Sequence, residues 1–292
     1  MALLRQNGYM EKVIATYHKD CIDGTTAAAV VLRKFPTAKL FPLTHAHRKE
    51  DIEPVLGLVD AETVCYTVDC GLGVKEFLAA GCKVTTLDHH SGAKDLFESI
   101  TRENENYTFI FDNEKSAASL AWSFFFPEEK QPELIRYVED ADLWKWKFGD
   151  DTKDVNNYLS MFRNDPKTML GFIEGDLSEI KSKGKVISMY ADKEIEVQIT
   201  LPPIDIKIGE HTVPAYNVTV YQSASGNILS DRLNKAVAMF TVEGDTVNFS
   251  FRSKDHHKPT SLELAHFLGG GGHQNAAGAD IALKEFLKMI VS

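Results

Sequence analysis

Apolar residues in the first half of the chain form short runs, and most of these runs end at an acidic residue or a histidine. The runs are rich in β-branched and aromatic residues, which favours β-strands over residues 12–17, 39–43, 63–68, 83–87 and 108–111. Between them, helices are predicted over residues 25–34, 74–80 and 116–126, the first ended by Pro36 and the second by Gly81. Strands that alternate with helices predict an α/β domain with a parallel sheet and helices on both faces.

The second half of the chain has a different pattern. Residues 132–193 are predicted to be mainly helical, and short strands with turns follow over residues 197–201, 204–208, 213–220, 236–242 and 246–251. A hairpin turn is expected at Gly244-Asp245, and a helix over residues 261–267 runs into four consecutive glycines. We therefore expect a first domain over residues 1–178, a linker helix over residues 179–199, and a smaller α+β domain over residues 200–292, facing the first across a cleft.

Composition narrows the class of protein. The 292 residues include 32 Lys and Arg against 42 Asp and Glu, a net charge of −10, with 43% hydrophobic residues. These proportions are typical of a soluble globular protein, and the acidity argues against a grip on long nucleic acid but not against a short nucleotide held by metal ions. The four cysteines form no CxxC, and neither a signal peptide nor a membrane span is recognisable, so a reducing cytoplasm is expected.

Acidic and histidine side chains gather at or just after three of the predicted strands: His18, Asp20, Asp23, Asp69, Asp88 and His89. The carboxyl ends of parallel strands meet at one edge of a sheet, so these side chains are expected to converge. So many carboxylates raise one another's pKa unless a cation neutralises them. Carboxylate and imidazole ligands suit Mn²⁺, Fe²⁺ or Zn²⁺, and their number suits two ions bridged by Asp69, the arrangement used for phosphoryl hydrolysis by an activated water.

The tripeptide Asp-His-His occurs twice, which provides an internal control. Asp88-His89-His90 follows a predicted strand, whereas Asp255-His256-His257 is flanked by lysines and follows no comparable strand end. The second copy is interpreted as a solvated loop. The tripeptide alone is therefore weak evidence, and the argument rests on the joint spacing of several motifs at strand ends.

Together these motifs resemble those of the DHH phosphoesterase superfamily, which includes RecJ-like nucleases, nanoRNases and cyclic-dinucleotide phosphodiesterases. The matching strings in the first domain are His-x-Asp-Cys-x-Asp-Gly at residues 18–24, Asp-Cys-Gly at residues 69–71 and Asp-His-His at residues 88–90. Residues 269–278 (GGGGHQNAAG) resemble the GGGH-x-x-AAG signature of the DHH-associated C-terminal domain, and residues 251–253 resemble its Arg-Ser element. The resemblance covers nearly the whole chain.

For the first domain the resemblance implies a centre of two Mn²⁺ ions, for which Mg²⁺, Fe²⁺ or Co²⁺ could substitute. The implied metal ligands are His18, Asp20, Asp23, Asp69, His89 and Asp140. The implied catalytic residues are His90, which would contact the scissile phosphate or assist the leaving group, and Asp88, which would orient a histidine. Two alternatives stay open: Cys21 in place of Asp20, and Asp142 in place of the preferred Asp140.

For the second domain the resemblance implies substrate binding by Arg252, Ser253, Gly270, Gly271, Gly272, His273 and Asn275. Glycines lack a Cβ, so their backbone N–H groups can approach a phosphate closely. Arg252 could bind a terminal phosphate through two hydrogen bonds, while His273 and Asn275 could contact a phosphate or a base.

The sequence thus predicts a cytoplasmic Mn²⁺-dependent phosphodiesterase, or oligonucleotide exonuclease. It would cleave short RNA (nanoRNA) or linear dinucleotides such as pGpG to nucleoside monophosphates. Its expected partners are these short substrates rather than long duplexes or membranes, and the oligomeric state is left open between monomer and homodimer. The alternatives are a phosphatase for 3′-phosphoadenosine 5′-phosphate (pAp), a cyclic-dinucleotide phosphodiesterase, and a catalytically silent nucleotide-binding module.

Overall fold

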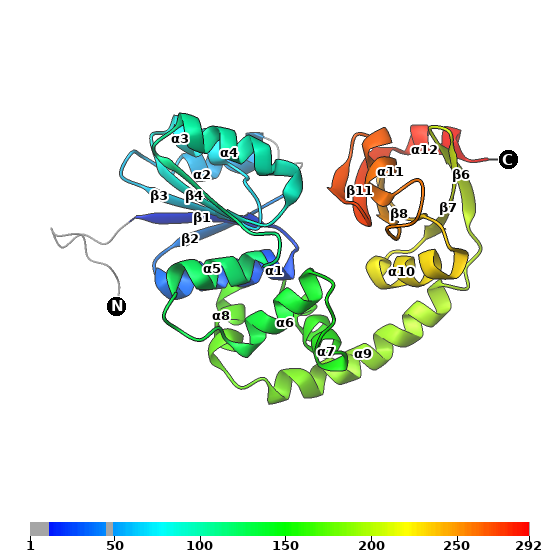
Figure 1. Ribbon diagram of the computed structural model, residues 1–292, viewed down its shortest axis with the longest axis horizontal. Helices are drawn as coiled ribbons and strands as arrows, with labels where there is room; N and C mark the ends of the chain where they lie inside the picture. The colour runs from blue at the N-terminus through cyan, green and yellow to red at the C-terminus, as the bar shows by residue number, and fades with distance from the viewer. Residues whose placement is uncertain (1–11, 45–48, 292) are drawn as a thin grey trace. The chain divides into compact units, whose positions relative to one another are not determined.

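The chain divides into two compact units in the computed structural model, which describes residues 12–44 and 49–291 (Figure 1). The first unit is Met1–Ser188 and the second unit is Met189–Ser292. The boundary falls within helix α9 (Ser178–Gln198), so the same helix contributes to both units.

The first unit is built on a five-stranded parallel sheet with the strand order β2-β1-β3-β4-β5. The strands are β1 (Val13–His18), β2 (Lys39–Leu43), β3 (Val64–Val68), β4 (Lys83–Asp88) and β5 (Tyr107–Phe111). The helices before α9 are α1 (Ile22–Lys34), α2 (Lys49–Leu56), α3 (Val74–Ala79), α4 (Lys94–Glu103), α5 (Ala117–Phe125), α6 (Glu133–Asp142), α7 (Asp150–Leu159) and α8 (Pro166–Glu174). Helices α1 and α5 cover one face of the sheet, while α3 and α4 cover the other (Figure 1).

Both faces of the sheet are apolar, as expected of a parallel sheet covered on each side. In β1, Val13, Ala15 and Tyr17 pack on the face covered by α1 and α5. Ile14, which points the other way, joins a second cluster with Phe77 of α3 and other residues. The prediction of a parallel α/β sheet with helices on both faces is confirmed.

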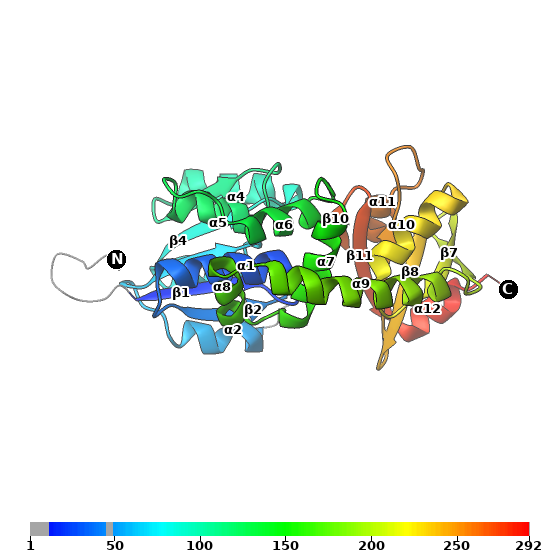
Figure 2. The same ribbon diagram turned by 90° about the horizontal axis from the view of Figure 1, so that it is seen from below.

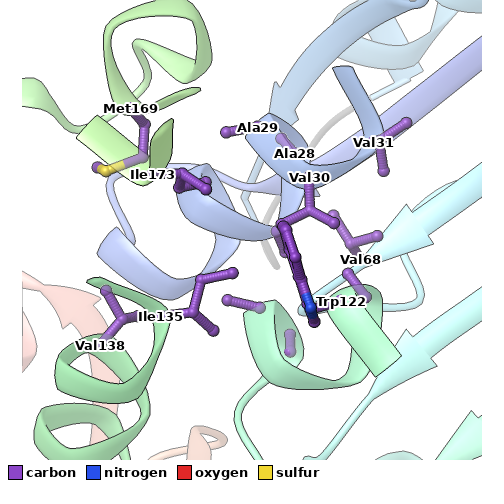
Figure 3. Packing of buried hydrophobic residues seen from close by; sticks show 14 of the residues in the cluster. Ala28, Ala29, Val30, Val31, Val68, Trp122, Ile135, Val138, Met169 and Ile173 are labelled. Carbon is purple, nitrogen blue, oxygen red and sulfur yellow. The ribbon is translucent and has the colours of Figure 1, made fainter. Parts of the chain in front are cut away.

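Helix α1 lies at the centre of the larger cluster, where residues 23–32 are all buried. Its run of alanines lets it pack closely against the strands and against α5, α6 and α8, since each small side chain takes up little space between backbones. Figure 3 shows Ala28, Ala29 and Val30 of α1 among Val68, Trp122, Ile135 and Met169 from the surrounding elements. The first turn of α1 is therefore held rigidly, and that turn carries Asp23.

The second unit contains a six-stranded sheet of order β10-β11-β9-β8-β7-β6, in which only the β7–β8 pair is parallel. Its strands are β6 (Ile204–Ile208), β7 (His211–Asn217), β8 (Val237–Glu243), β9 (Thr246–Arg252), β10 (Gly271–His273) and β11 (Ala276–Ala282). Its helices are α10 (Gln222–Leu233), α11 (Ser261–Phe267) and α12 (Leu283–Met289). Helix α10 lies alongside β8 (Figure 2), where its Leu229 packs with Val237 and Met239 in one apolar cluster. Helices α11 and α12 pack in a second apolar cluster of this sheet. The predicted second, α+β region is confirmed.

Some predicted elements differ from the structure. The strand expected over residues 197–201 is wrong: Val197 and Gln198 end α9, and Ile199 N–H still donates to Ile195 O at 3.0 Å. The apolar residues that suggested a strand lie near the end of a helix. Helix α10 was not predicted, because its sequence QSASGNILSDRL is rich in Ser and Gly, which have low helix propensity. The hairpin turn at Gly244-Asp245 does connect β8 to β9.

In the parts of the chain that the structure describes, no helix combines the length and the apolar character needed to cross a membrane.

Candidate metal centre

A cluster of acidic and histidine side chains lies at the carboxyl edge of the five-stranded sheet. His18 ends β1, Asp69 directly follows β3, and Asp88 ends β4. The chain leaves β1 toward β2 on one side, while β3 pairs on the other side, so the strand order reverses between β1 and β3. Ligands of open α/β sheets bind at such a reversal, outside the carboxyl ends of the strands.

Asp69 is the central carboxylate of this cluster. It is 1% exposed and has φ 61°, in the left-handed region that a non-glycine residue rarely occupies. Its Oδ1 lies 3.3 Å from His89 Nε2, and its Oδ2 lies 3.6 Å from His18 Nδ1 and accepts no hydrogen bond from the described residues. A Cβ at Gly24 would lie 2.9 Å from Oδ2, so the glycine leaves room for this oxygen. The two oxygens of Asp69 therefore face different histidines.

His89 Nε2 is surrounded by carboxylates. Besides Asp69, it lies 3.5 Å from Asp142 Oδ2 and 3.8 Å from Asp23 Oδ2. Asp23 also accepts hydrogen bonds from Ala117 N–H at 2.6 Å and Ala118 N–H at 3.0 Å. These bonds tie the first turn of α1 to the start of α5 and fix the position of Asp23.

Asp88 orients the neighbouring histidine. Its Oδ1 accepts the backbone N–H groups of His89 at 2.7 Å and His90 at 3.1 Å, and it lies 2.7 Å from His90 Nδ1. A carboxylate on one ring nitrogen sets the tautomer and the direction of the imidazole. Asp88 thus positions His90 next to Asp69, whose Oδ1 is 3.9 Å from His90 Nδ1.

The pKa shifts in the cluster reflect buried carboxylates crowded around histidines. Burial opposes the ionisation of Asp69, yet its interactions with His18 and His89 hold its pKa well below the usual range. Burial opposes protonation of His89, but the surrounding carboxylates outweigh it and raise the pKa of the imidazole to about 10. Burial, with the charge of Asp69, raises the pKa of Asp23 to about 6, and burial also raises that of Asp142 well above its usual range. These directions are expected where several carboxylates share few positive charges, and a bound cation would relieve the repulsion between them.

The donor set fits divalent metal ions. Among the described residues, three groups could hold a metal ion: the ligand atoms within each group lie within 4.8 Å of one another, and the groups share Asp69 and His89. The groups are Asp69 with Asp88, His89 and His90; His18 with Cys21 and Asp69; and Asp23 with His89 and Asp142. Mixed imidazole and carboxylate donors suit Mn²⁺, Fe²⁺ or Zn²⁺, and the buried Oδ2 of Asp69, which no described donor satisfies, is an atom that a cation would satisfy.

Two of the six predicted ligands are not brought to this cluster. Asp140 turns away: its carboxylate accepts N–H from Lys147 at 2.8 Å and Phe148 at 3.2 Å, and the hydroxyl of Thr152 at 2.5 Å. The nearby acidic residue that faces His89 is Asp142, the alternative left open by the sequence. Side chains two positions apart on a helix point to different sides, so only one of Asp140 and Asp142 can face the site.

Asp20 is the second predicted ligand outside the cluster. It has φ 59°, and its Oδ1 accepts from Asn164 Nδ2 at 2.5 Å while its own N–H donates to Asn164 Oδ1. Cys21 lies with His18 and Asp69 instead, at the N-cap of α1, where its Sγ accepts Gly24 N–H at 3.5 Å. Asn164 was missed by the sequence reasoning, because it is 144 residues from its partner and belongs to no motif.

The predicted substrate-binding residues of the second unit gather around three adjacent strands. Gly271 and Gly272 of β10 pair with β11, and β11 pairs with Arg252 of β9. A Cβ at Gly270 would collide with Gly278 O, so this glycine allows the close approach of β11. His273 ends β10 and is exposed.

Polar side chains of that group already have hydrogen-bond partners, some of them outside the group. Arg252 donates to Ser223 Oγ at 2.5 Å and to Ser250 Oγ at 3.0 Å, and burial lowers the pKa of its guanidinium to about 10. Ser253 is buried and donates toward Asn275 Oδ1 at 3.3 Å. Ser223, on α10, lies outside the predicted set, and a phosphate bound by Arg252 would have to share or replace it.

The second Asp-His-His string differs from the prediction of a solvated loop. His257 is only 4% exposed, and its Nδ1 accepts Lys254 N–H at 3.1 Å and lies 3.3 Å from Ser230 Oγ. His256 does remain exposed, beside Asn234. The reason is a turn in which His257 accepts a backbone hydrogen bond from three residues earlier and so folds inward.

The chain is similar in sequence to one viral protein and in fold to two solved structures. The chain is 24% identical to the uncharacterized protein R106 of Acanthamoeba polyphaga mimivirus, over 91% of this chain and 66% of that protein. The solved structure of RecJ from Thermus thermophilus in complex with Mn²⁺ matches 98% of this chain and 51% of its own, with 16% identity and a TM-score of 0.58. A structure of exonuclease RecJ bound to manganese matches 95% of this chain and 88% of its own, with 16% identity and a TM-score of 0.52.

No family model matches the chain. The chain spans about two thirds of the viral protein and about half of the Thermus RecJ chain. At 16% identity this likeness shows the fold alone: the chain has the fold of the two RecJ structures, which is the fold that the resemblance in the sequence motifs implied.

Proposed function

We propose, from this DHH-superfamily fold and the geometry of the centre, that the protein is a metal-dependent phosphodiesterase. It would hydrolyse short oligonucleotides or linear dinucleotides of the pGpG type to nucleoside monophosphates. The observation that carries the proposal is the placement of Asp69, whose two buried oxygens face His18 on one side and His89 on the other. A carboxylate between two ligand groups is what a centre of two ions requires.

The proposed ligands are divided between the two oxygens of Asp69. His18, with Cys21 nearby, would serve the side of Oδ2, and His89, Asp23 and Asp142 the side of Oδ1. Ions bound there would polarise the phosphoryl oxygens and lower the pKa of an attacking water toward neutrality. Mn²⁺ is the proposed ion, because the donors are imidazole and carboxylate, and the two RecJ structures reported above were solved with it.

His90 is proposed as the residue that assists the leaving oxygen. Burial opposes protonation of its imidazole, but Asp88, 2.7 Å from Nδ1, outweighs burial and raises the pKa of the ring. A histidine kept protonated by a carboxylate can donate a proton to the departing 3′-oxygen. Asp88 would then be a positioning residue, and its loss would weaken catalysis through His90.

The second unit is proposed to bind the end of the substrate. Its β10–β11 hairpin offers backbone N–H groups beside Arg252, and Gly271 leaves open space where a side chain would stand. A terminal phosphate recognised in this way favours short fragments. The net charge of −10 agrees, since a protein that gripped long polyanions would need a basic surface.

The deciding experiment is a substrate panel with purified protein and Mn²⁺. The panel contains pGpG, pAp, cyclic dinucleotides, and short RNA and DNA oligomers from dinucleotides upward, with products resolved over time. We expect mononucleotides to appear from the shortest linear substrates, and loss of turnover with a chelator or in Asp69→Asn. Faster release of phosphate from pAp, or ring opening of a cyclic dinucleotide, would replace the proposed substrate; tight binding without metal-dependent turnover would favour a silent binding module.

A further inference from the structure

A loop rich in tryptophan and lysine directly follows the acidic residue that faces His89. Residues 143–149 have the sequence Leu-Trp-Lys-Trp-Lys-Phe-Gly and connect α6 to α7. Trp144 is 47% exposed, Trp146 is half-buried, and their rings meet edge to face with centroids 4.9 Å apart. Two neighbouring indoles at the surface are unusual, because aromatic rings this large normally bury most of their area.

The loop is held in a defined shape. The carboxylate of Asp140 is buried and accepts the N–H groups of Lys147 and Phe148. Lys145 Nζ donates to Glu114 O at 2.9 Å, which ties the loop to the segment before α5. These contacts fix the backbone and the lysine stem, and they do not cover the exposed face of Trp144.

The backbone conformation of the loop also indicates that it is held in a defined shape. Trp144 has φ 53° and Trp146 has φ 49°, both in the left-handed region that bulky residues avoid. Such conformations persist only where the surrounding structure holds them in place. The Phe148 ring contributes by packing edge to face on Tyr137, at 5.3 Å between centroids.

The loop lies close to the candidate centre. Asp142 Oδ2 is 3.5 Å from His89 Nε2, and Trp144 is two residues further along the chain. Since consecutive Cα atoms are about 3.8 Å apart, the Cα of Trp144 is within about 8 Å of that of Asp142. A strand whose phosphate reaches His89 from the side of Asp142 would pass within reach of these indoles.

We propose that Trp144 and Trp146 stack on unpaired bases of single-stranded nucleic acid beside the scissile phosphate, and that Lys147 contacts the neighbouring phosphate. The proposal deepens the proposed function and rests on it. Aromatic rings stack on every base, and a cationic residue nearby follows the backbone, which is how proteins bind single strands without reading their sequence. Lys147 is exposed, and with Lys145 it makes the loop locally basic in an acidic chain. A duplex is excluded because its bases hide their faces in the stack.

The test compares a tetranucleotide with an abasic strand of the same length, which keeps the charge and removes the stacking. We expect kcat/KM for the tetranucleotide to exceed that for the abasic strand by about 5- to 100-fold, mostly through KM. The double variant Trp144→Ala, Trp146→Ala should bring this ratio near one, while Trp144→Phe should retain most of it. Phe124→Ala is the matched control, because Phe124 is 40% exposed on α5 of the same unit.

A binding measurement separates this proposal from the proposed function. The third tryptophan, Trp122, is 4% exposed, so quenching of the fluorescence by an oligonucleotide reports the two loop indoles. The tetranucleotide should quench the fluorescence and the abasic strand should not. Absence of hydrolysis in every arm would overturn the phosphodiesterase, and quenching would still decide the stacking. Equal quenching by a duplex or by the abasic strand, or an unchanged kcat/KM ratio in the double variant, would overturn the stacking.

Discussion

The tripeptide Asp-His-His occurs once in each unit, and its two copies have opposite electrostatic surroundings. In the first unit, burial disfavours the charged form of His89, but three carboxylates within 4 Å of Nε2 outweigh it and raise the pKa to about 10. In the second unit, His257 is buried against Ser230 and a backbone N–H, and burial, with His256 nearby, lowers its pKa. The same tripeptide thus places a histidine among carboxylates that could hold a cation in one unit, and packs a histidine against a hydroxyl and a backbone N–H in the other. Strand ends that gather carboxylates make the difference.

The largest expected difference is in catalysis. His89→Gln should lower kcat/KM of the Mn²⁺-dependent reaction by about 10³-fold, because metal stabilisation of a phosphoryl transition state is worth several kcal/mol. His256→Gln, at the same position of the second copy, should stay within about two-fold, since His256 is exposed and contacts Asn234 and the ring of His257 rather than a cluster of carboxylates. Steady-state kinetics on one short RNA measures both. Similar losses in the two variants would erase the contrast.

The affinity for the metal should rise with pH, because the metal competes with a proton on His89. His89 has a folded pKa of about 10, above the ordinary 6.5, so its proton stabilises the metal-free fold fully below pH 6.5 and this stabilisation is lost as pH rises through 10. A metal must displace that proton, so affinity should rise about tenfold per pH unit between pH 6.5 and 10, for this one proton. Calorimetry in buffers of different ionisation enthalpy would count the protons released. Affinity independent of pH in this window would contradict the pKa of His89.

A third contrast lies between the two acidic residues near the end of α6. Asp142→Asn should weaken Mn²⁺ binding by about 10- to 100-fold with little change in the free energy of unfolding of the metal-free protein. Asp140→Asn should do the reverse: it removes charge from a carboxylate with three hydrogen bonds and should cost about 1–3 kcal/mol of stability. Metal titration and urea unfolding of both variants, with the metal removed, check the pair. If Asp140→Asn proved the stronger metal defect, Asp140 would regain the role that the sequence suggested.

The smallest expected effect belongs to His257. His257→Gln should lower the free energy of unfolding by about 1–2 kcal/mol, because Lys254 N–H and Ser230 would lose a buried partner. Since the pKa of His257 is depressed, its contribution is present above pH 6.5 and declines as pH falls below that value. Urea unfolding at about pH 8 and about pH 5.5, on either side of the ordinary histidine pKa, measures this. An accompanying loss of Mn²⁺ affinity would show that the second copy is not merely structural.

The sequence predicted most of what lies at strand ends and less of what lies in loops. Asp69 and His89 were found because parallel strands deliver their last residues to one edge, a rule that needs no side-chain coordinates. Asp142 could not be separated from Asp140, because the choice depends on which one accepts the N–H groups of the following loop. Asp20 instead forms a hydrogen bond with Asn164, which is 144 residues away, and no local sequence pattern predicts such a contact.

The exposed indoles were missed for a related reason. Residues 144–148 alternate Trp and Phe with Lys, a period of two that favours a short strand rather than the loop that the structure shows. The proposed role of this loop depends on the hydrogen bonds to the Asp140 carboxylate and on the exposure of Trp144, and both are defined only in the folded chain. In the second unit, the hairpin of β10 and β11 was likewise hidden, because glycine and alanine have low strand propensity.

Helix α1 carries Asp23 in its first turn and is buried from residue 23 to residue 32. The segments that exchange their amide hydrogens last are those with the deepest burial, and α1 belongs to them. One side of the candidate metal centre is therefore attached to a segment that we expect to open least. Ligands on a rigid helix keep their spacing. The site should therefore select ions by radius and coordination number, because the ligands cannot move to fit a different ion. If Mn²⁺ is the ion bound, an ion as large as Ca²⁺, which prefers about six to eight oxygens, should therefore bind poorly in the same frame.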